Sequence, residues 1–221
     1  MTHEEILQGL YDNTLVGNAP EVKGLVNQGL EDDLGPDSML YDALIPSLEE
    51  VGARFERGDF FVPEMLIAAR AMQGALDILR PLLVAEGVQQ IGTFVMGTVK
   101  GDVHDIGKNL VNIMLEGAGF TVHDLGVNVA PETFVEQVQE HKPEIVGFSA
   151  FLTTTMPMFK ANINALEKAG IRDEVIVMVG GAPVTQEYAD KVGADGYAAD
   201  ASAAVRLAKD LIQRKRSAVP A

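Results

Sequence analysis

Residues 92–125 read GTFVMGTVKGDVHDIGKNLVNIMLEGAGFTVHDL, and this stretch decides the fold. It opens with an apolar run over 92–99 that is short enough for a buried strand. A helical pattern of apolar residues follows over 106–117, and a second strand-like run covers 121–125. Strand, helix and strand in this order predict two parallel strands joined by a crossover helix.

The same alternation continues toward the C-terminus. Further strands are predicted at 145–149, 175–179 and 196–198, and further helices at 132–140, 156–168, 185–191 and 202–214. This pattern predicts an α/β fold: a flavodoxin-like or Rossmann-like doubly wound, five-stranded parallel sheet with helices on both faces. In the strand order 2-1-3-4-5 the first, third and fourth strands are neighbours. The loops that follow them would form one rim, where open parallel sheets bind ligands.

The first part of the chain has a helical period instead. Apolar faces recur over four segments between residues 2 and 87, and short connections between four helices predict a small bundle. Pro46 falls inside the third helix and predicts a kink there. We therefore predict two domains: a helical bundle at 1–88, and a sheet domain at 89–221.

Composition excludes several classes of function. The chain has no cysteine, so disulfides and thiolate metal sites are ruled out. A formal net charge of -15 repels phosphate backbones and anionic lipids, and Arg214-Lys215-Arg216 is explained by a helix C-terminus. We therefore expect no nucleic acid and no membrane as partners. Since the N-terminus has no basic segment before an apolar stretch, we predict a cytoplasmic protein.

The loop after the first strand contains the strongest candidate for chemistry. Asp102 and His104 lie two residues apart between Gly101 and Gly107. One imidazole nitrogen can bind a metal while the other donates a hydrogen bond to a carboxylate. The alternative is a solvated loop with incidental polar residues, which is the interpretation that we give to the other histidines: His3, His123 and His141.

The loops after the third and fourth strands offer different groups. Ser149 and the run Thr153–Thr155 present hydroxyls, although threonines before a helix could simply cap it. Gly180 and Gly181 present backbone without side chains, which lets a bulky flat ligand approach the sheet. Each feature alone is also compatible with an ordinary turn.

Together these elements resemble one family. Residues 101–109 resemble the DxHxxG signature of cobalamin-binding domains, Ser149-Ala150-Phe151 resembles its SxL element, and Gly180-Gly181 resembles its GG element. Phe151 replaces the leucine of SxL. In the helical half, 51–55 and 61–65 resemble the cap of cobalamin-dependent methionine synthase. The chain is identified as a member of the stand-alone corrinoid proteins of methanol, methylamine and methoxyaromatic methyltransferase systems.

The resemblance implies a cofactor and a set of site residues. Cobalamin would bind with its own base displaced and with His104 as the lower cobalt ligand, while Asp102 and Thr155 complete a hydrogen-bonded relay. Phe55 and Val62 would cover the upper face, and their alternative role is bundle core. The remaining contacts to the cofactor and its nucleotide tail would be made by Gly101, Val103, Asp105, Ile106, Gly107, Ser149, Phe151, Leu152, Thr153, Gly180, Gly181, Ala182, Tyr197, Ala199 and Asp200.

The implied function is that of a carrier subunit. The cofactor would alternate between cob(I)alamin and methylcobalamin, and 85–90 is the hinge candidate that lets the cap move. The partners would be a substrate-specific methyltransferase and an acceptor methyltransferase that passes the methyl to tetrahydrofolate or a thiol coenzyme. A reductive activator and a homo-oligomer are also compatible with this role. The methyl donor and acceptor stay open.

Three other interpretations share parts of the pattern. The small subunit of an adenosylcobalamin-dependent mutase has DxHxxG, but the four-helix cap is not expected there. A cobalamin-based sensor needs an output domain, and this chain has no basic DNA-reading segment. A response-regulator receiver needs a phosphoaccepting Asp at the end of the third strand, where Ser149 stands.

Overall fold

The computed structural model describes residues 1–85 and 91–218. Within these ranges the chain divides into two compact units, a helical unit and a unit built on a sheet. The domain boundary predicted at 88/89 lies outside the described residues, as does the hinge candidate apart from Ala85. Within the same ranges no helix has the length and apolarity that crossing a membrane requires.

The first unit is helical throughout. Its elements are α1 (His3–Leu15), α2 (Ala19–Glu31), α3 (Pro36–Ser38), the π-helical turn η1 (Met39–Leu44), α4 (Ile45–Arg57) and α5 (Val62–Ala85). Thr2 starts α1 with a capping box, because its hydroxyl accepts from Glu5 N at 3.2 Å and its own N–H donates to Glu5 Oε2 at 2.8 Å. The apolar stripes that the sequence predicts line the core, including the fully buried Ile6, Leu10, Val22, Val26, Met39, Leu44, Met65, Met72 and Leu79.

The helix around Pro46 runs from α3 through η1 into α4. The N–H of Ile45 donates to Leu40 O, five residues back, so the hydrogen-bond ladder shifts from the α to the π pattern just before the proline. Pro46 has no N–H and its ring crowds the preceding turn. The helix therefore accommodates Pro46 through a π-helical turn and continues beyond it as α4.

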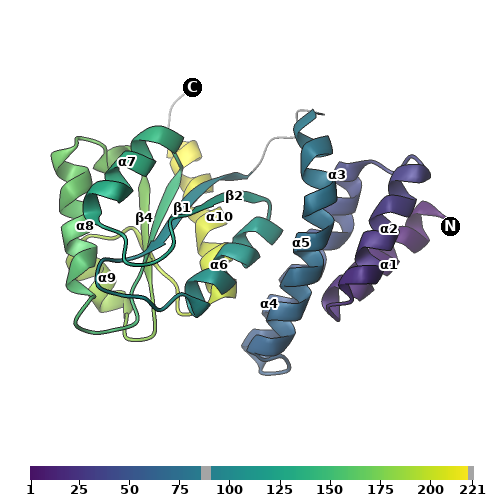
Figure 1. Ribbon diagram of the computed structural model, residues 1–221, viewed down its shortest axis with the longest axis horizontal. Coiled ribbons are helices and arrows are strands. Elements are labelled where there is room, and N and C mark those ends of the chain that lie inside the picture. Colours follow the sequence, from purple (N-terminus) through teal and green to yellow (C-terminus); the bar gives the residue numbers. More distant parts are fainter. Residues whose placement is uncertain (86–90, 219–221) are drawn as a thin grey trace. The chain divides into compact units, whose positions relative to one another are not determined.

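The second unit is a five-stranded parallel sheet in the order β2-β1-β3-β4-β5, which confirms the predicted fold class and strand order. Helices α7, α8 and α9 cover one face, and α6 and α10 cover the other (Figure 1). The strands are β1 (Gly92–Thr98), β2 (Phe120–Asp124), β3 (Ile145–Ser149), β4 (Ile176–Gly180) and β5 (Gly196–Tyr197). The helices are α6 (Ile106–Gly117), α7 (Pro131–His141), α8 (Pro157–Lys168), the 3-10 turn η2 (Arg172–Glu174), α9 (Gln186–Val192) and α10 (Ala201–Ala218).

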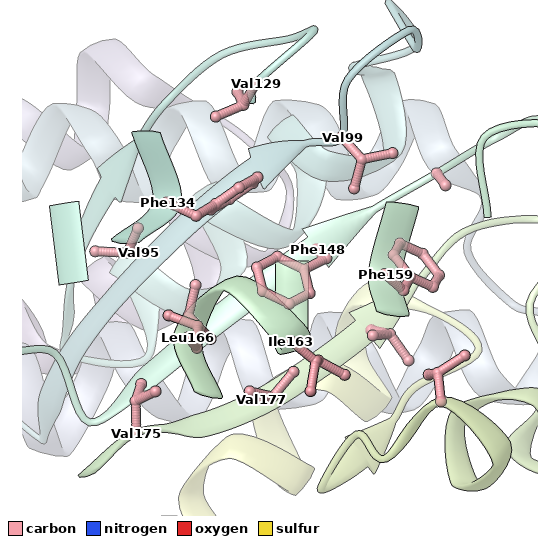
Figure 2. Close-up of a cluster of buried hydrophobic side chains, with 14 of the residues drawn as sticks. Val95, Val99, Val129, Phe134, Phe148, Phe159, Ile163, Leu166, Val175 and Val177 are labelled. Carbon is pink, nitrogen blue, oxygen red and sulfur yellow. The ribbon is translucent and has the colours of Figure 1, made fainter. Parts of the chain in front are cut away.

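One hydrophobic core lies between the sheet and α7, α8 and α9. Every second strand residue points into it, including Val95, Phe148 and Val177, and these meet helix residues such as Phe134 and Phe159 (Figure 2). The rings of Phe134 and Phe148 pack edge to face with centroids 4.8 Å apart. The apolar face that alternate residues form on the strands therefore packs against the apolar faces that recur every 3.6 residues on the helices.

The register of the sheet aligns the ends of its central strands. Thr98 of β1 pairs with Ser149 of β3, and Ser149 pairs with Gly180 of β4. The loops that follow these three strands therefore start at the same level of the sheet. This alignment places the candidate residues of three separate sequence segments on one rim.

The basic cluster at the end of α10 contacts the end of the sheet at which β1, β3 and β4 begin. Arg216 donates to Ile91 O at 2.9 Å and lies 3.5 Å from a Glu144 carboxylate oxygen. Lys215 donates to Glu174 O, and Arg214 pairs with Asp210 at 2.7 Å. These contacts agree with a structural role for the cluster.

Candidate functional site

The loop after β1 holds a buried carboxylate next to an exposed imidazole. Asp102 is fully buried, whereas the side chain of His104 is 45% exposed. The backbone of the loop is fixed at both ends, because Asp102 N donates to Val99 O at 3.1 Å and Thr98 Oγ1 donates to His104 O at 3.1 Å. The sequence pattern thus becomes a rigid turn with one acidic group inside and one imidazole at the surface.

Five hydrogen bonds converge on the Asp102 carboxylate. Its Oδ1 accepts from the backbone N–H of His104 at 3.1 Å and contacts His104 Nδ1 at 2.7 Å. Its Oδ2 accepts from the N–H groups of Phe151 and Leu152 at 2.8 and 3.2 Å, and from Thr155 Oγ1 at 2.7 Å. Burial alone would raise the pKa of Asp102, but the hydrogen bonds from Thr155, His104 and Phe151 outweigh it and hold that pKa well below its ordinary value.

An ionised Asp102 determines the tautomer of His104. A carboxylate only accepts hydrogen bonds, so the contact at 2.7 Å requires a proton on Nδ1. In the neutral imidazole, Nε2 then carries the lone pair, and it has no hydrogen-bond partner among residues 1–85 and 91–218. The site therefore presents an imidazole nitrogen with an available lone pair, and the opposite ring nitrogen is held by a buried carboxylate.

Thr155 acts in this site and does not cap a helix. Its hydroxyl is buried and bonds to Asp102, while α8 begins at Pro157 without a side-chain cap. Thr153 lies exposed in the same turn and makes no contact with Asp102. The threonine run alone did not distinguish these two residues, but the family resemblance implied Thr155 for the relay, and the hydroxyl of Thr155 is the one that bonds to Asp102.

Exposed apolar side chains lie in the same loops as the imidazole, and one of them stacks on it. The ring of Phe151 stacks on that of His104 with centroids 4.4 Å apart and an interplanar angle of 25°. Val103 is 67% exposed, Ile106 is 75% exposed, and Leu152 and Val127 are also exposed. Exposed apolar groups gathered around one polar atom are typical of a site for a large, mostly apolar ligand.

The loop after β2 contributes residues that the sequence reasoning missed. Asn128 Oδ1 accepts from Gly101 N at 2.8 Å, and Asn128 N donates to Asp102 O at 2.9 Å. Asn128 has a φ of 55°, a conformation that asparagine tolerates better than most residues. A signal was available, since the segment follows a parallel strand and must reach the same edge of the sheet as the His104 loop.

The start of α6 is fixed by a second buried group that the sequence did not single out. Lys108 is 2% exposed and donates to both carboxylate oxygens of Asp124, at the end of β2, and to Asn109 Oδ1 at 2.6 Å. Asn109 Nδ2 in turn donates to Asp105 at 3.2 Å. Asp105 therefore supports the first turn of α6, immediately after the His104 loop.

The glycine pair after β4 allows two backbones to approach closely. Gly181 has a φ of 138°, and a Cβ built on it would lie 1.8 Å from the carbonyl oxygen of Ala150. Ala150 N donates to Gly180 O at 3.1 Å, so the loops after β3 and β4 touch directly. Ser149, Gly180, Gly181 and Ala182 thus share one end of the sheet with Asp102.

The predicted residues near β5 lie further along the same edge. Tyr197 ends β5, and Ala199 is exposed in the following loop. Asp200 Oδ1 accepts from Ala203 N at 2.8 Å and so caps α10. The structure does not bring these three residues into contact with the Asp102 network.

Comparison with known proteins identifies the family of this site. A family model described as a B12 binding domain matches residues 92–206, and a second B12 binding domain model matches 6–80. A dimethylamine corrinoid protein from Methanosarcina barkeri is 44% identical over 96% of this chain and 100% of that protein. The chain belongs to the B12-binding corrinoid proteins. Its cofactor is cobalamin.

Further relatives and solved structures agree with this assignment. A trimethylamine corrinoid protein from Methanosarcina mazei is 43% identical over 84% of this chain and 86% of that protein. The methanol:cobalamin methyltransferase complex MtaBC from Methanosarcina barkeri contains a chain of similar structure, with a TM-score of 0.83 and 28% identity over 96% of this chain and 81% of that chain. A cobalamin-binding protein from Desulfitobacterium hafniense has a TM-score of 0.78 and 29% identity over 93% of this chain and 98% of that chain.

The residues present in this corrinoid protein fit cobalamin. Cobalamin would bring a metal held in a large flat ring, and His104, whose side chain is 45% exposed, would offer it the lone pair of Nε2. The exposed Val103, Ile106 and Leu152 provide apolar surface around that donor. The site thus offers one imidazole nitrogen and exposed apolar side chains in the same loops, which suits a metal that is already held by a large organic ring.

The two predicted cap residues of the corrinoid protein lie in the helical unit. Phe55 is half-buried in the last turns of α4, and Val62 is 40% exposed at the start of α5. Val62 and the neighbouring Phe61 are exposed, unlike the buried residues of the bundle core. Their role as a cover for cobalamin stays a prediction.

The other histidines of the corrinoid protein have local partners. His3 Nε2 contacts Asp32 O at 2.7 Å within the helical unit. The rings of His123 in β2 and His141 in α7 stack with centroids 3.7 Å apart. Burial, followed by the nearby His141, lowers the pKa of His123 below its ordinary value of 6.5, against an opposing effect of Glu140.

This lowered pKa predicts that the free energy of unfolding decreases in mild acid. A histidine whose pKa is depressed in the folded state binds its proton more readily when unfolded, so stability is complete above 6.5 and is lost as pH falls below it. In urea denaturation at about pH 7.5 and about pH 5.5, we expect the decrease to be smaller for His123→Gln than for the parent protein. Equal decreases in both proteins would contradict the prediction.

Proposed function

We propose that this corrinoid protein is a methyl carrier in which His104 Nε2 is the lower ligand of the cobalt in cobalamin. The observation that carries the proposal is the fixed tautomer of His104. Buried Asp102 holds Nδ1 at 2.7 Å, which leaves the lone pair on Nε2 of a side chain that is 45% exposed. A histidine on a surface without such a partner would divide its population between tautomers and rotamers.

The groups behind His104 have the role of positioning it. The second oxygen of Asp102, Oδ2, accepts hydrogen bonds from Thr155 and from the backbone N–H groups of Phe151 and Leu152. Only Oδ1 then remains to hold the imidazole of His104. The ring can leave and return to a metal without rearrangement of the buried network. We assign Asp102 and Thr155 to this support, and His104 to direct ligation.

Cobalamin, when bound, supplies a cobalt centre that accepts a methyl group and releases it. The chain's exposed Val103, Ile106 and Leu152 would exclude water from the edge of the ring. Phe55 and Val62 of the bundle domain would cover the other face. Residues 1–88 are proposed as this cap domain and residues 89–221 as the cobalamin-binding domain.

The remaining rim residues are proposed to hold the nucleotide tail. Gly101 and Gly107 flank His104 without side chains, and Gly180 and Gly181 leave backbone exposed beside Ser149. Because Gly180 has no side chain, there is room beside it. A Cβ built on Gly180 would lie 3.7 Å from its nearest neighbour, Ala198 O. The other proposed tail contacts are Thr153, Ala182, Tyr197, Ala199 and Asp200.

A methylamine methyltransferase is the proposed donor-side partner, and dimethylamine is the first methyl donor to test. Full-length relatives from Methanosarcina are named as dimethylamine corrinoid proteins, and a further one as a trimethylamine corrinoid protein. MtaBC, which contains a chain of similar structure, is a methanol:cobalamin methyltransferase complex. An acceptor methyltransferase and a reductive activator complete the proposed set of partners.

The ligand assignment is tested in the reconstituted protein. The apo-protein is loaded with hydroxocobalamin, freed of excess by gel filtration and reduced to Co(II), with histidine nitrogen labelled as nitrogen-15. We expect the superhyperfine splitting of the EPR spectrum to change with the label and to disappear in His104→Ala. Cobalamin that washes off, or a splitting that ignores the label, would overturn the assignment.

The carrier role has its own test. The reduced holo-protein is incubated with dimethylamine and a dimethylamine methyltransferase, and formation of methylated cofactor is followed by absorbance. Methanol with its methyltransferase serves as the matched comparison. Methylation from dimethylamine alone supports the proposed donor, whereas methylation from methanol alone, or from neither, contradicts it.

A further inference from the structure

We propose that Phe151 is a positioning residue for His104, which holds the imidazole plane and stabilises it in the metal-ligating state. The inference rests on the proposed ligation of cobalt by His104. Phe151 occupies the position of the leucine in the SxL pattern. Its ring can stack on the imidazole of His104, which a leucine side chain cannot do. The stacked rings lie 4.4 Å apart at 25°.

Asp102 alone leaves one rotation of the imidazole undetermined. A hydrogen bond at Nδ1 fixes one atom of the ring, but the ring can still rock about the line from Nδ1 to Asp102 Oδ1. Contact of Phe151 with the ring face removes this freedom. Two contacts of different kinds, one at an edge and one on a face, therefore define the direction of Nε2 before a ligand arrives.

Phe151 is itself anchored to the same carboxylate. Its backbone N–H donates to Asp102 Oδ2 at 2.8 Å, while Oδ1 contacts His104. The backbone of Phe151 and the ring of His104 thus both bond to the buried carboxylate of Asp102, which lies 49 positions before Phe151 in the sequence. Substituting the side chain at 151 leaves this backbone bond intact, which makes the ring contribution testable by itself.

The stack also favours one chemical state of the imidazole. The face of a phenyl ring is electron-rich, and an imidazole that shares its Nε2 lone pair with a metal becomes electron-poor. The attraction between the rings is therefore stronger when His104 is ligated.

The first experiment uses apo-protein labelled with nitrogen-15 at histidine. We expect NMR to show His104 protonated at Nδ1, with its ring protons shifted upfield by the Phe151 ring current. This shift should disappear in Phe151→Leu and persist in Phe151→Tyr, which keeps an aromatic face. Ring protons of His104 at the same position in the parent protein and in Phe151→Leu would overturn the stack.

The second experiment measures ligation in protein loaded with hydroxocobalamin. Weaker binding of His104 to Co(II) makes reduction to Co(I) easier, since Co(I) favours the unligated state. We expect Phe151→Leu to weaken the ligation about three- to fivefold. In a one-electron couple each tenfold change corresponds to about 59 mV, so the midpoint potential of Co(II)/Co(I) should rise by about 30 to 40 mV. Phe151→Tyr should stay close to the parent protein.

The outcomes separate the inference from the proposed function. If the parent protein lacks a nitrogen-15 splitting in EPR, the proposed ligation itself fails. If the splitting is present and Phe151→Leu has the midpoint potential of the parent, the ligation stands and the role of Phe151 is wrong. Retention of cobalamin on gel filtration and an unchanged far-ultraviolet circular dichroism spectrum show that the variant is folded.

Discussion

Asp102→Asn should weaken the binding of His104 to cobalt by about ten- to a hundredfold while leaving the fold intact. An amide nitrogen must replace one carboxylate oxygen, and it donates where the oxygen accepts. At the Oδ2 position it would face three donors, from Phe151, Leu152 and Thr155. The amide should therefore turn its NH₂ group toward His104.

This orientation reverses the tautomer of His104. An NH₂ group at the Oδ1 position needs an acceptor, and Nδ1 can supply one only by moving its proton to Nε2. The protonated Nε2 then has no lone pair for a metal. The backbone N–H of His104 also loses its acceptor, so we expect a decrease of about 1 to 3 kcal/mol in the free energy of unfolding.

Nitrogen-15 NMR of the apo-protein detects the tautomer directly, and Co(II) EPR detects its consequence. Thr155→Val is a matched comparison, because it removes one hydrogen bond to Asp102 and leaves the carboxylate charge and its contact with Nδ1 in place. We expect that variant to keep the parent tautomer. If Asp102→Asn leaves a proton on Nδ1 and full nitrogen-15 splitting, the carboxylate does not set the tautomer.

Gly181→Ala should destabilise the sheet unit by about 3 kcal/mol or more. Its φ of 138° strains any residue with a side chain, and the new Cβ would lie 1.8 Å from the carbonyl oxygen of Ala150. Ala150 N already donates to Gly180 O, so the two backbones cannot separate without losing a hydrogen bond. The loop after β3, which carries Phe151 and Leu152, would have to move with it.

Gly180→Ala is the control for this prediction. A Cβ at Gly180 would meet Ala198 O at 3.7 Å, an ordinary van der Waals distance. Urea denaturation should therefore place Gly180→Ala within about 1 kcal/mol of the parent protein. A Gly181→Ala variant as stable as Gly180→Ala would show that the backbone relaxes freely. Weaker cobalamin retention by a folded Gly180→Ala would support its place beside the nucleotide tail.

The sequence by itself determined the architecture of the sheet unit and the centre of its site. Short apolar runs alternating with helical periods specify five parallel strands, because each strand must be buried on both faces and each helix on one. The carboxyl ends of such strands meet at one edge, so Asp102, Ser149 and Gly180 could be placed together from their positions after strands. The pairing of Asp102 with His104 is local, two residues apart, and was readable for the same reason.

Only the tertiary structure decided which distant groups complete the site. Asn128 reaches Gly101 across 27 positions, and no pattern in the sequence indicated it. The family resemblance implied Thr155 for the relay, but its direct bond to Asp102 across 53 positions is visible only in the structure. The π-helical turn before Pro46 and the stack of Phe151 on His104 were likewise not indicated by the sequence. Periodicity reports which face of an element is buried. Which side chain meets which depends on strand register, loop geometry and rotamer, and these are settled by packing among segments far apart in the chain.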